Sequence, residues 1–202
     1  MKVLLINGSP HEKGCTYTAL SLIAGELKAQ GIETEILHVG GQPVGGCIGR
    51  SGNGCVFGGV VNEAIEKAKT ADAFVFGSPV HYASAAGNMA SFMDRLAYAG
   101  GKYLAYKPAA ICCSARRAGT TSTLDQLVKY PQFFHMPLVN GSYWAMVHGS
   151  NPEQVLQDAE GCAVMQELGR NMAWLLHCIE AGKAAGIDHP QNPPRPMTNF
   201  IR

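Results

Sequence analysis

The 202-residue sequence contains few charged residues. Lys and Arg number 16 and Asp and Glu 15, which gives a formal net charge of +1 and a charged fraction of 15%, against roughly 25% in typical soluble domains. No run of Lys and Arg is present, which argues against a nucleic-acid-binding protein. The 47% hydrophobic content argues against intrinsic disorder. A surface with so little charge is compatible with self-association, and we expect a homodimer or homotetramer.

Long apolar segments are also missing. No stretch approaches the roughly 18 residues that a membrane span requires. The N-terminus MKVLLINGSP has one Lys and a four-residue apolar run, too short for the core of a signal peptide. We therefore expect a cytoplasmic protein without membrane contact. The seven cysteines, an odd number, are interpreted mainly as reduced thiols.

The sequence is rich in glycine, with 24 residues, and its short apolar runs alternate with segments of helical spacing. This alternation is typical of parallel α/β architecture. Five strands are predicted, at residues 3–6, 34–39 (an edge strand, because it carries two acids), 73–76, 109–113 and within 136–147. Helices are predicted at residues 15–30, 60–68, 89–96, a short one near 124–128, and 151–182 with Asn151 as its cap. We expect one domain over residues 1–187 and an extended, Pro-rich arm over 188–202.

The connection after the first strand, Asn7–Tyr17, is rich in glycine and hydroxyl side chains. In open α/β sheets, ligands bind beyond the carboxyl ends of the strands. The following helix begins with N–H groups that have no internal partner, so this loop is suited to a phosphate. An ordinary strand–helix turn with Ser or Thr capping is the alternative. The loop matches neither GxxxxGK[ST] nor GxGxxG, which disfavours a nucleotide-hydrolysing P-loop and a dinucleotide fold.

A second turn of the same type, Gly77–Tyr82, follows the third strand. Its apolar and aromatic side chains offer edges for a flat ring system. With strand order 2-1-3-4-5, this turn faces the same crevice as the first. Alone it is more often a helix-entry turn with a packed Tyr, and the presence of two GSP turns favours a ligand site.

Three motifs together resemble the NAD(P)H-dependent FMN reductase family of flavodoxin-like proteins: GSPHEKGCT, GSPVHYASAAGNMASFMDR and the loop Ser114–Gly119. The resemblance covers residues 1 to about 150. It implies a flavodoxin-like three-layer sandwich with a five-stranded parallel sheet in order 2-1-3-4-5. It also implies bound FMN, reduced by NADPH or NADH, that passes electrons to a small-molecule acceptor such as a quinone, flavin, azo compound or metal ion.

The resemblance also assigns cofactor-binding residues. It places around the FMN phosphate Ser9, His11, Cys15, Thr16 and Tyr17; along the isoalloxazine Pro79, Val80, His81 and Tyr82; and near its pyrimidine end Ser114, Ala115, Arg116, Arg117 and Gly119. An Arg in the third loop would stabilise negative charge on reduced flavin, unless it is solvated or faces a phosphate. His11 stands where the family commonly has Arg, and Cys15 where it has Asn. No catalytic residue is assigned, because the flavin itself accepts the hydride.

The glycine-rich segment 45–55 carries Cys47 and Cys55. Some relatives have a compact four-Cys run here that binds an iron–sulfur cluster, which needs about four thiolates. Here Arg50 stands in place of a ligand, so we expect no metal. We interpret the segment as a loop near a subunit interface that has lost its metal ligands. The alternative is that Cys47 and Cys55 form a disulfide or a redox-responsive pair.

Several single residues have open interpretations. Cys15, at a helix start, has either a lowered pKa or only a backbone role in its loop. Asp94 and Arg95 are interpreted as an ion pair or a subunit contact, and Trp144 and Trp174 as core or interface.

Two other functions compete with an oxidoreductase. One is a flavodoxin-type electron carrier, although such carriers typically dock through an acidic surface and this chain has a formal charge of +1. The other is a flavin-binding redox sensor without NAD(P)H turnover.

Overall fold

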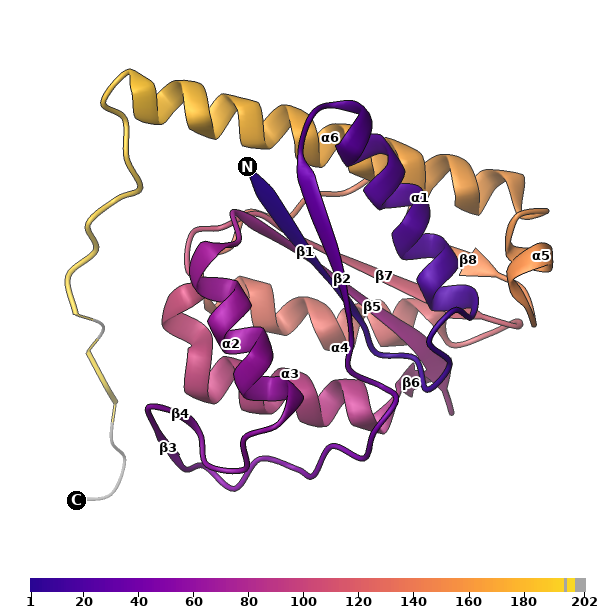
Figure 1. Ribbon diagram of the computed structural model, residues 1–202, viewed down its shortest axis with the longest axis horizontal. Helices are drawn as coiled ribbons and strands as arrows, with labels where there is room; N and C mark the ends of the chain where they lie inside the picture. Colours follow the sequence, from indigo (N-terminus) through magenta and orange to yellow (C-terminus); the bar gives the residue numbers. More distant parts are fainter. Residues whose placement is uncertain (195, 199–202) are drawn as a thin grey trace.

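A parallel sheet forms the centre of the computed structural model, which describes residues 1–194 and 196–198. Its strands lie in the order β2-β1-β5-β7-β8 (Figure 1), which is 2-1-3-4-5 when the parallel strands are numbered along the chain. The five are β1 (Lys2–Asn7), β2 (Glu33–His38), β5 (Ala73–His81), β7 (Ala109–Ala115) and β8 (Met146–His148). This arrangement confirms the predicted flavodoxin-like sandwich.

Three short strands lie outside this path. Strand β6 (Ser84–Ala85) pairs antiparallel with the end of β5, while β3 (Ser51–Gly52) and β4 (Gly54–Cys55) form a separate two-stranded hairpin.

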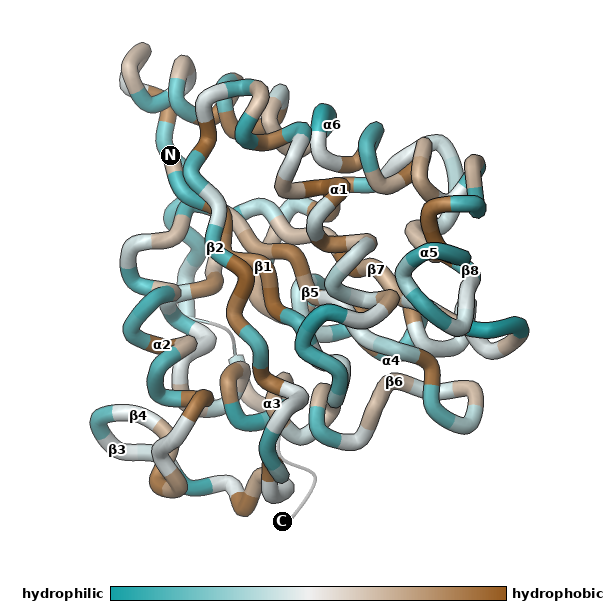
Figure 2. The backbone as a smooth tube through the Cα atoms, turned by 45° about the vertical axis from the view of Figure 1, so that its right-hand side comes forward, coloured by the Kyte–Doolittle hydropathy of each residue, from teal (hydrophilic) through white to brown (hydrophobic). Residues whose placement is uncertain are grey.

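Helices cover both faces of the sheet, which explains why its strands are continuous apolar runs (Figures 1 and 2). Side chains alternate along β1, so that Val3 and Leu5 belong to one core cluster and Leu4 and Ile6 to the other. One face carries α1 (Cys15–Ala29), α5 (Pro152–Val155) and α6 (Ala159–Ala184). The other carries α2 (Val60–Thr70), α3 (Gly87–Gly100), the 3-10 turn η1 (Gly101–Tyr103) and α4 (Thr120–Phe133).

The edge position of β2 is also confirmed. Its Glu35 carboxylate pairs with Lys2 (2.8 Å) and Lys67 (2.6 Å). These ion pairs lower the pKa of Glu35.

The single helix expected over residues 151–182 is two helices. Asn151 Oδ1 accepts a hydrogen bond from Gln154 N (2.9 Å) and starts α5. Asp158 Oδ1 accepts one from Gly161 N (3.0 Å) and starts α6, while its Oδ2 accepts from His148 N (2.8 Å). Because each cap begins a new helix, the chain turns between them, and the helical spacing in the sequence did not show the break.

Two other boundaries differ from expectation. Helix α4 is longer than predicted and includes Pro131. Strand β8 has three residues, and upstream of it Leu138 makes an isolated bridge to Ala109.

The described residues of the arm, 188–194 and 196–198, follow α6 without regular secondary structure (Figure 1). The first residues of the arm contact the domain through Tyr106: the His189 ring stacks on the Tyr106 ring (4.4 Å, 4°), and Asn192 Nδ2 donates to the Tyr106 hydroxyl (2.6 Å). In the described part of the chain, no helix is both long and apolar enough to cross a bilayer. The domain boundary at residue 187 and the cytoplasmic location stay predictions.

Candidate functional site

The first predicted loop meets the carboxyl ends of β5 and β7. The turn expected at residues 77–82 begins later than predicted, because residues 77–81 continue β5, and Ser114 and Ala115 belong to β7. Gly8 N, after β1, donates to Gly77 O in β5 (2.9 Å). Pro79 in β5 lies in register with Ser114 in β7. The Ser114 hydroxyl shares a hydrogen bond with the Thr16 hydroxyl at the start of α1 (2.8 Å). These contacts join the loop after β1 to the carboxyl ends of β5 and β7 in one hydrogen-bonded unit.

The first loop is held in place by a buried asparagine. Asn7 is 0% exposed. Its Oδ1 accepts from Ser9 N (3.1 Å), and its Nδ2 donates to Glu12 O (2.9 Å). His38 Nε2 lies 2.7 Å from Ser9 O, and because a carbonyl oxygen only accepts, Nε2 carries the proton. Sequence reasoning missed both residues as loop supports. Asn7 carries a detectable signal, a polar residue that ends an apolar run just before Gly-Ser.

The backbone of the loop after β2 approaches the first loop closely at Gly40. A Cβ atom on Gly40 would lie 2.2 Å from Ser9 O. Only glycine therefore fits at this position.

The start of α1 is open to an anion. Its N-cap is Gly14, no side chain caps it, and its first turn contains no acidic residue. The first helical hydrogen bond runs from Thr18 N to Gly14 O (3.0 Å), so the preceding amides have no helical acceptor. An open cavity of about 560 Å³ adjoins this loop, lined by residues 10–15 and 150–152. The positive end of the helix dipole favours negative charge here.

Cys15 differs from expectation at this helix start. Burial raises the pKa of its thiol, so the proposed lowering of its pKa is wrong. Its Sγ donates to Gly149 O (3.5 Å) and ties α1 to the end of β8.

The second turn is strained. Tyr82 (φ 50°) and Ala83 (φ 59°) both have left-handed backbones where β5 folds back into β6. Such residues cost about 1–3 kcal/mol each and persist only where the surroundings enforce them. Ser122 Oγ donates to Ala83 O (2.6 Å), and a Cβ on Gly119 (φ 93°) would lie 2.6 Å from Ala83 Cα. Helix α4 thus braces a turn that leaves the Tyr82 side chain fully exposed.

The remaining predicted residues divide by exposure. Ser9, Thr16, Ser114 and Ala115 are buried; Cys15, Tyr17, Pro79, Val80 and Gly119 are half-buried; and His11, His81, Tyr82, Arg116 and Arg117 are exposed. The Thr16 and Ser114 hydroxyls share a hydrogen bond, so these two side chains connect the start of α1 to the end of β7.

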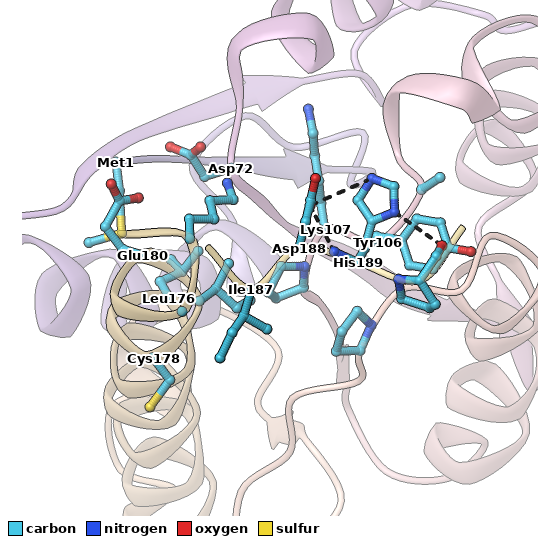
Figure 3. Close-up of a pocket in the computed structure, with 17 residues that line it drawn as sticks. Met1, Asp72, Tyr106, Lys107, Leu176, Cys178, Glu180, Ile187, Asp188 and His189 are labelled. Carbon is cyan, nitrogen blue, oxygen red and sulfur yellow. Dashed lines mark hydrogen bonds and ion pairs between the residues drawn. The ribbon is translucent and has the colours of Figure 1, made fainter. Parts of the chain in front are cut away.

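A further cavity lies near the amino ends of β1, β5 and β7, where Met1, Asp72 and Pro108 line it (Figure 3). Its volume is about 640 Å³, and its walls include Asp72, Tyr106, Lys107, Leu176 and His189. Lys107 donates to Ala68 O (2.7 Å), and burial lowers its pKa. None of the predicted site residues lines this cavity.

Other single-residue expectations are also resolved. Asp94 and Arg95 do not form an ion pair: Asp94 accepts a hydrogen bond from the Tyr130 hydroxyl, and Arg95 donates to Cys55 and Gly58. The core interpretation of Trp144 and Trp174 is wrong, because both are exposed.

A family model described as NADPH-dependent FMN reductase matches residues 1–151, the segment that contains all three loops. The chain belongs to this family. Membership confirms the resemblance drawn from the GSP turns, and it supports an FMN-dependent oxidoreductase of flavodoxin-like fold.

The chain is similar to a curated flavoprotein and to solved structures of the same fold. An iron-sulfur flavoprotein of Methanocaldococcus jannaschii is 26% identical over 192 residues, which cover 89% of this chain and 100% of the relative. RosB with a bound 8-demethyl-8-formylriboflavin-5′-phosphate intermediate superposes with a TM-score of 0.71 at 13% identity, over 100% of this chain and 96% of RosB. The apo form of the NADH:FMN oxidoreductase EmoB has a TM-score of 0.66 at 17% identity, over 86% and 89%. The last two likenesses establish the fold.

Proposed function

We propose that this chain transfers electrons from NADPH or NADH, through bound FMN, to a small-molecule acceptor such as a quinone, free flavin, azo compound or metal ion. The observation that carries the proposal is the convergence of the loop after β1 with the carboxyl ends of β5 and β7, joined by the Gly8–Gly77 and Thr16–Ser114 hydrogen bonds. Family membership supports the flavin.

The first loop would hold the phosphate. The amides of Thr16 and Tyr17 precede the first helical hydrogen bond of α1 and are available as donors. The Ser9 hydroxyl oxygen accepts from His11 N (3.1 Å), which leaves the hydroxyl hydrogen free to donate. The exposed Lys13 adds positive charge to the same loop.

The second and third loops would orient the ring. Pro79 and Val80 are half-buried near the carboxyl end of β5, and a braced turn holds the backbone of the exposed Tyr82, so these side chains would offer apolar surface to the ring. FMN, when bound, would supply the ring that accepts the hydride and passes its electrons to the acceptor. Arg116 and Arg117 are exposed after β7, where a guanidinium would stabilise negative charge on the ring or attract a nicotinamide phosphate.

An anaerobic visible spectrum tests the proposal. The purified chain is titrated with FMN, and NADPH and then NADH are added. Tight binding followed by bleaching identifies an oxidoreductase and its donor. Binding without bleaching, but with reduction by dithionite, indicates a carrier or sensor instead. Absence of FMN binding overturns the three-loop argument.

Two variants localise the site. Ser9→Ala and Tyr82→Ala should weaken FMN binding, whereas Tyr143→Ala serves as the control, because Tyr143 is exposed on a segment outside the three loops. Equal effects of Tyr82→Ala and Tyr143→Ala on the FMN affinity would show that the second loop does not contact the ring.

We also propose that the chain forms a homodimer or homotetramer. The exposed Trp144 and Trp174 support this proposal, because Trp is enriched at protein interfaces. Light scattering coupled to size exclusion measures the mass, and a monomer at micromolar concentration would refute it.

A further inference from the structure

The segment between β2 and α2 lacks the ligands of an iron–sulfur cluster. The M. jannaschii relative is named an iron-sulfur flavoprotein, and such clusters are held by about four thiolates. Here the segment supplies Cys47 and Cys55. Of the other cysteines, two are buried in β7 and three lie on α1 and α6, which cover the opposite face of the sheet. Across the described residues, no three His, Cys, Asp or Glu side chains are grouped to hold a metal.

A buried arginine occupies the surroundings of Cys55. Arg95, on α3, is 6% exposed. Its Nε donates to Cys55 Sγ (3.1 Å), its Nη2 donates to Gly58 O (3.1 Å), and its guanidinium lies 5.2 Å from the centre of the Phe57 ring. Among the described residues, no carboxylate forms an ion pair with Arg95. The Arg95 guanidinium therefore makes its polar contacts with residues 55–58.

A second side chain fixes the backbone of the same segment. Asn62 Oδ1 accepts from Cys55 N (2.7 Å), and Asn62 Nδ2 donates to Cys55 O (3.1 Å). The turn closes with Gly58 N donating to Cys55 O (3.0 Å). All these bonds form between protein groups, so the segment is ordered without a metal.

We propose that Arg95 takes the place of a cluster in this chain: it braces the hairpin β3–β4 and the turn into α2 through Cys55, and the segment binds no iron–sulfur cluster. Two copies of the chain together would have four such cysteines, but Cys55 is not available to bind a cluster shared between them. Cys55 is 7% exposed, and its sulfur accepts from Arg95 instead of facing a second subunit. Together with the proposed function, on which this step rests, the inference means that electrons pass from the flavin directly to the acceptor.

Metal analysis tests the first half of the proposal. The full chain is incubated anaerobically with ferrous iron and sulfide, desalted, and assayed for iron, acid-labile sulfide and absorbance near 400 nm. We expect far less than one iron per chain. Retention of about four irons per chain, or of about two irons per chain through a cluster shared by two copies, overturns the proposal. Loss of this iron in the double variant Cys47→Ser/Cys55→Ser would assign it to the segment.

Amide hydrogen exchange tests the role of Arg95. Arg95→Met keeps the length and apolar stem of the side chain, and we expect the Cys55 and Gly58 amides to exchange at least about tenfold faster, because charge-assisted bonds to the segment are lost. Arg170→Met is the matched control, since Arg170 forms an exposed ion pair with Glu26 on α1 (3.1 Å). Unchanged protection in Arg95→Met refutes the brace. FMN titration of the wild-type chain is independent of both assays, so failure of the proposed function would be recognised separately.

Discussion

Replacing Asn7 by Ala should weaken both the fold and the phosphate loop. The side chain is fully buried and makes two hydrogen bonds, from Ser9 N and to Glu12 O. Ala removes both bonds and leaves Ser9 N in a buried position without its acceptor. Leaving the buried Ser9 amide unpaired costs about 1–3 kcal/mol, and loss of the half-buried bond to Glu12 O costs about 1 kcal/mol, so we expect a total loss of about 2–4 kcal/mol in the free energy of unfolding. In a chain of this length, that loss lowers Tm by about 5–15 °C.

The same change should weaken FMN binding. Ser9 and Glu12 lie in the loop proposed to hold the phosphate, and an unpinned loop must be ordered when the ligand binds. We expect Kd for FMN to rise about tenfold or more, which corresponds to about 1.4 kcal/mol.

A matched asparagine provides the control for Asn7→Ala. Asn171 donates one exposed hydrogen bond to Asn140 O (2.8 Å), and Asn171→Ala should cost less than about 1 kcal/mol. Urea denaturation gives the free energies, and flavin fluorescence gives Kd. If the two variants lose equal stability, or if FMN affinity is unchanged in Asn7→Ala, the loop is not supported as described.

Three further predictions concern other parts of the fold. Gly119→Ala should lower the free energy of unfolding by more than about 2 kcal/mol, because φ is 93° at this position and the new Cβ would lie 2.6 Å from Ala83 Cα. Gly87→Ala is the control and should be nearly neutral, because no atom lies within 4 Å of the new Cβ; thermal melts compare the two variants. The pKa of Glu35 is lowered in the folded chain, so its ion pairs stabilise the protein above the unfolded value near 4.5 and this contribution is lost as pH falls through the folded pKa. Glu35→Gln should therefore lower the free energy of unfolding in urea by less than about 1 kcal/mol at pH 7, and by progressively less as the pH falls below 4.5; a loss that does not change with pH would contradict this. Burial raises the pKa of Cys15, so iodoacetamide at pH 7.5 should label the exposed Cys178 first, as peptide mass mapping would show; faster labelling of Cys15 would refute this order.

Local sequence patterns and the family resemblance were sufficient to predict the order of the parallel strands and the positions of the first four, but not the length of β5 or the bounds of β8. The apolar runs at residues 3–6 and 73–76 are continuous because both faces of each strand are covered. The acids at 33 and 35 indicated an edge strand because their carboxylates need lysine partners or solvent. The repeated GSP motifs indicated a site where the parallel strands end, because the carboxyl ends of parallel strands meet at the same side of the sheet. The first GSP lies in a loop, whereas the second continues β5.

The supports of the site depend on contacts between distant residues, which local patterns do not encode. His38 contacts Ser9 across 29 positions, and Arg95 contacts Cys55 across 40. The adjacent Asp and Arg of the FMDR segment suggested an ion pair, but residues at i and i+1 on a helix do not face each other. The break before α6 was missed for a related reason: Asp158 caps the helix and also binds His148 N, a contact fixed only once β8 is in place.

The hydrogen bonds that join the three loops couple ligand binding to stability at one edge of the sheet. A ligand that binds the folded chain stabilises it by about 2.7 kcal/mol at a concentration 100 times Kd. Because Gly8 is bonded to Gly77 and Thr16 to Ser114, FMN bound by the first loop would also order the ends of β5 and β7. The stacked contact of the arm on Tyr106 lies at the opposite edge and shares none of these bonds. FMN should therefore increase amide protection at the carboxyl ends of β1, β5 and β7 more than at the arm, whereas equal protection at both edges would indicate only a global shift in stability.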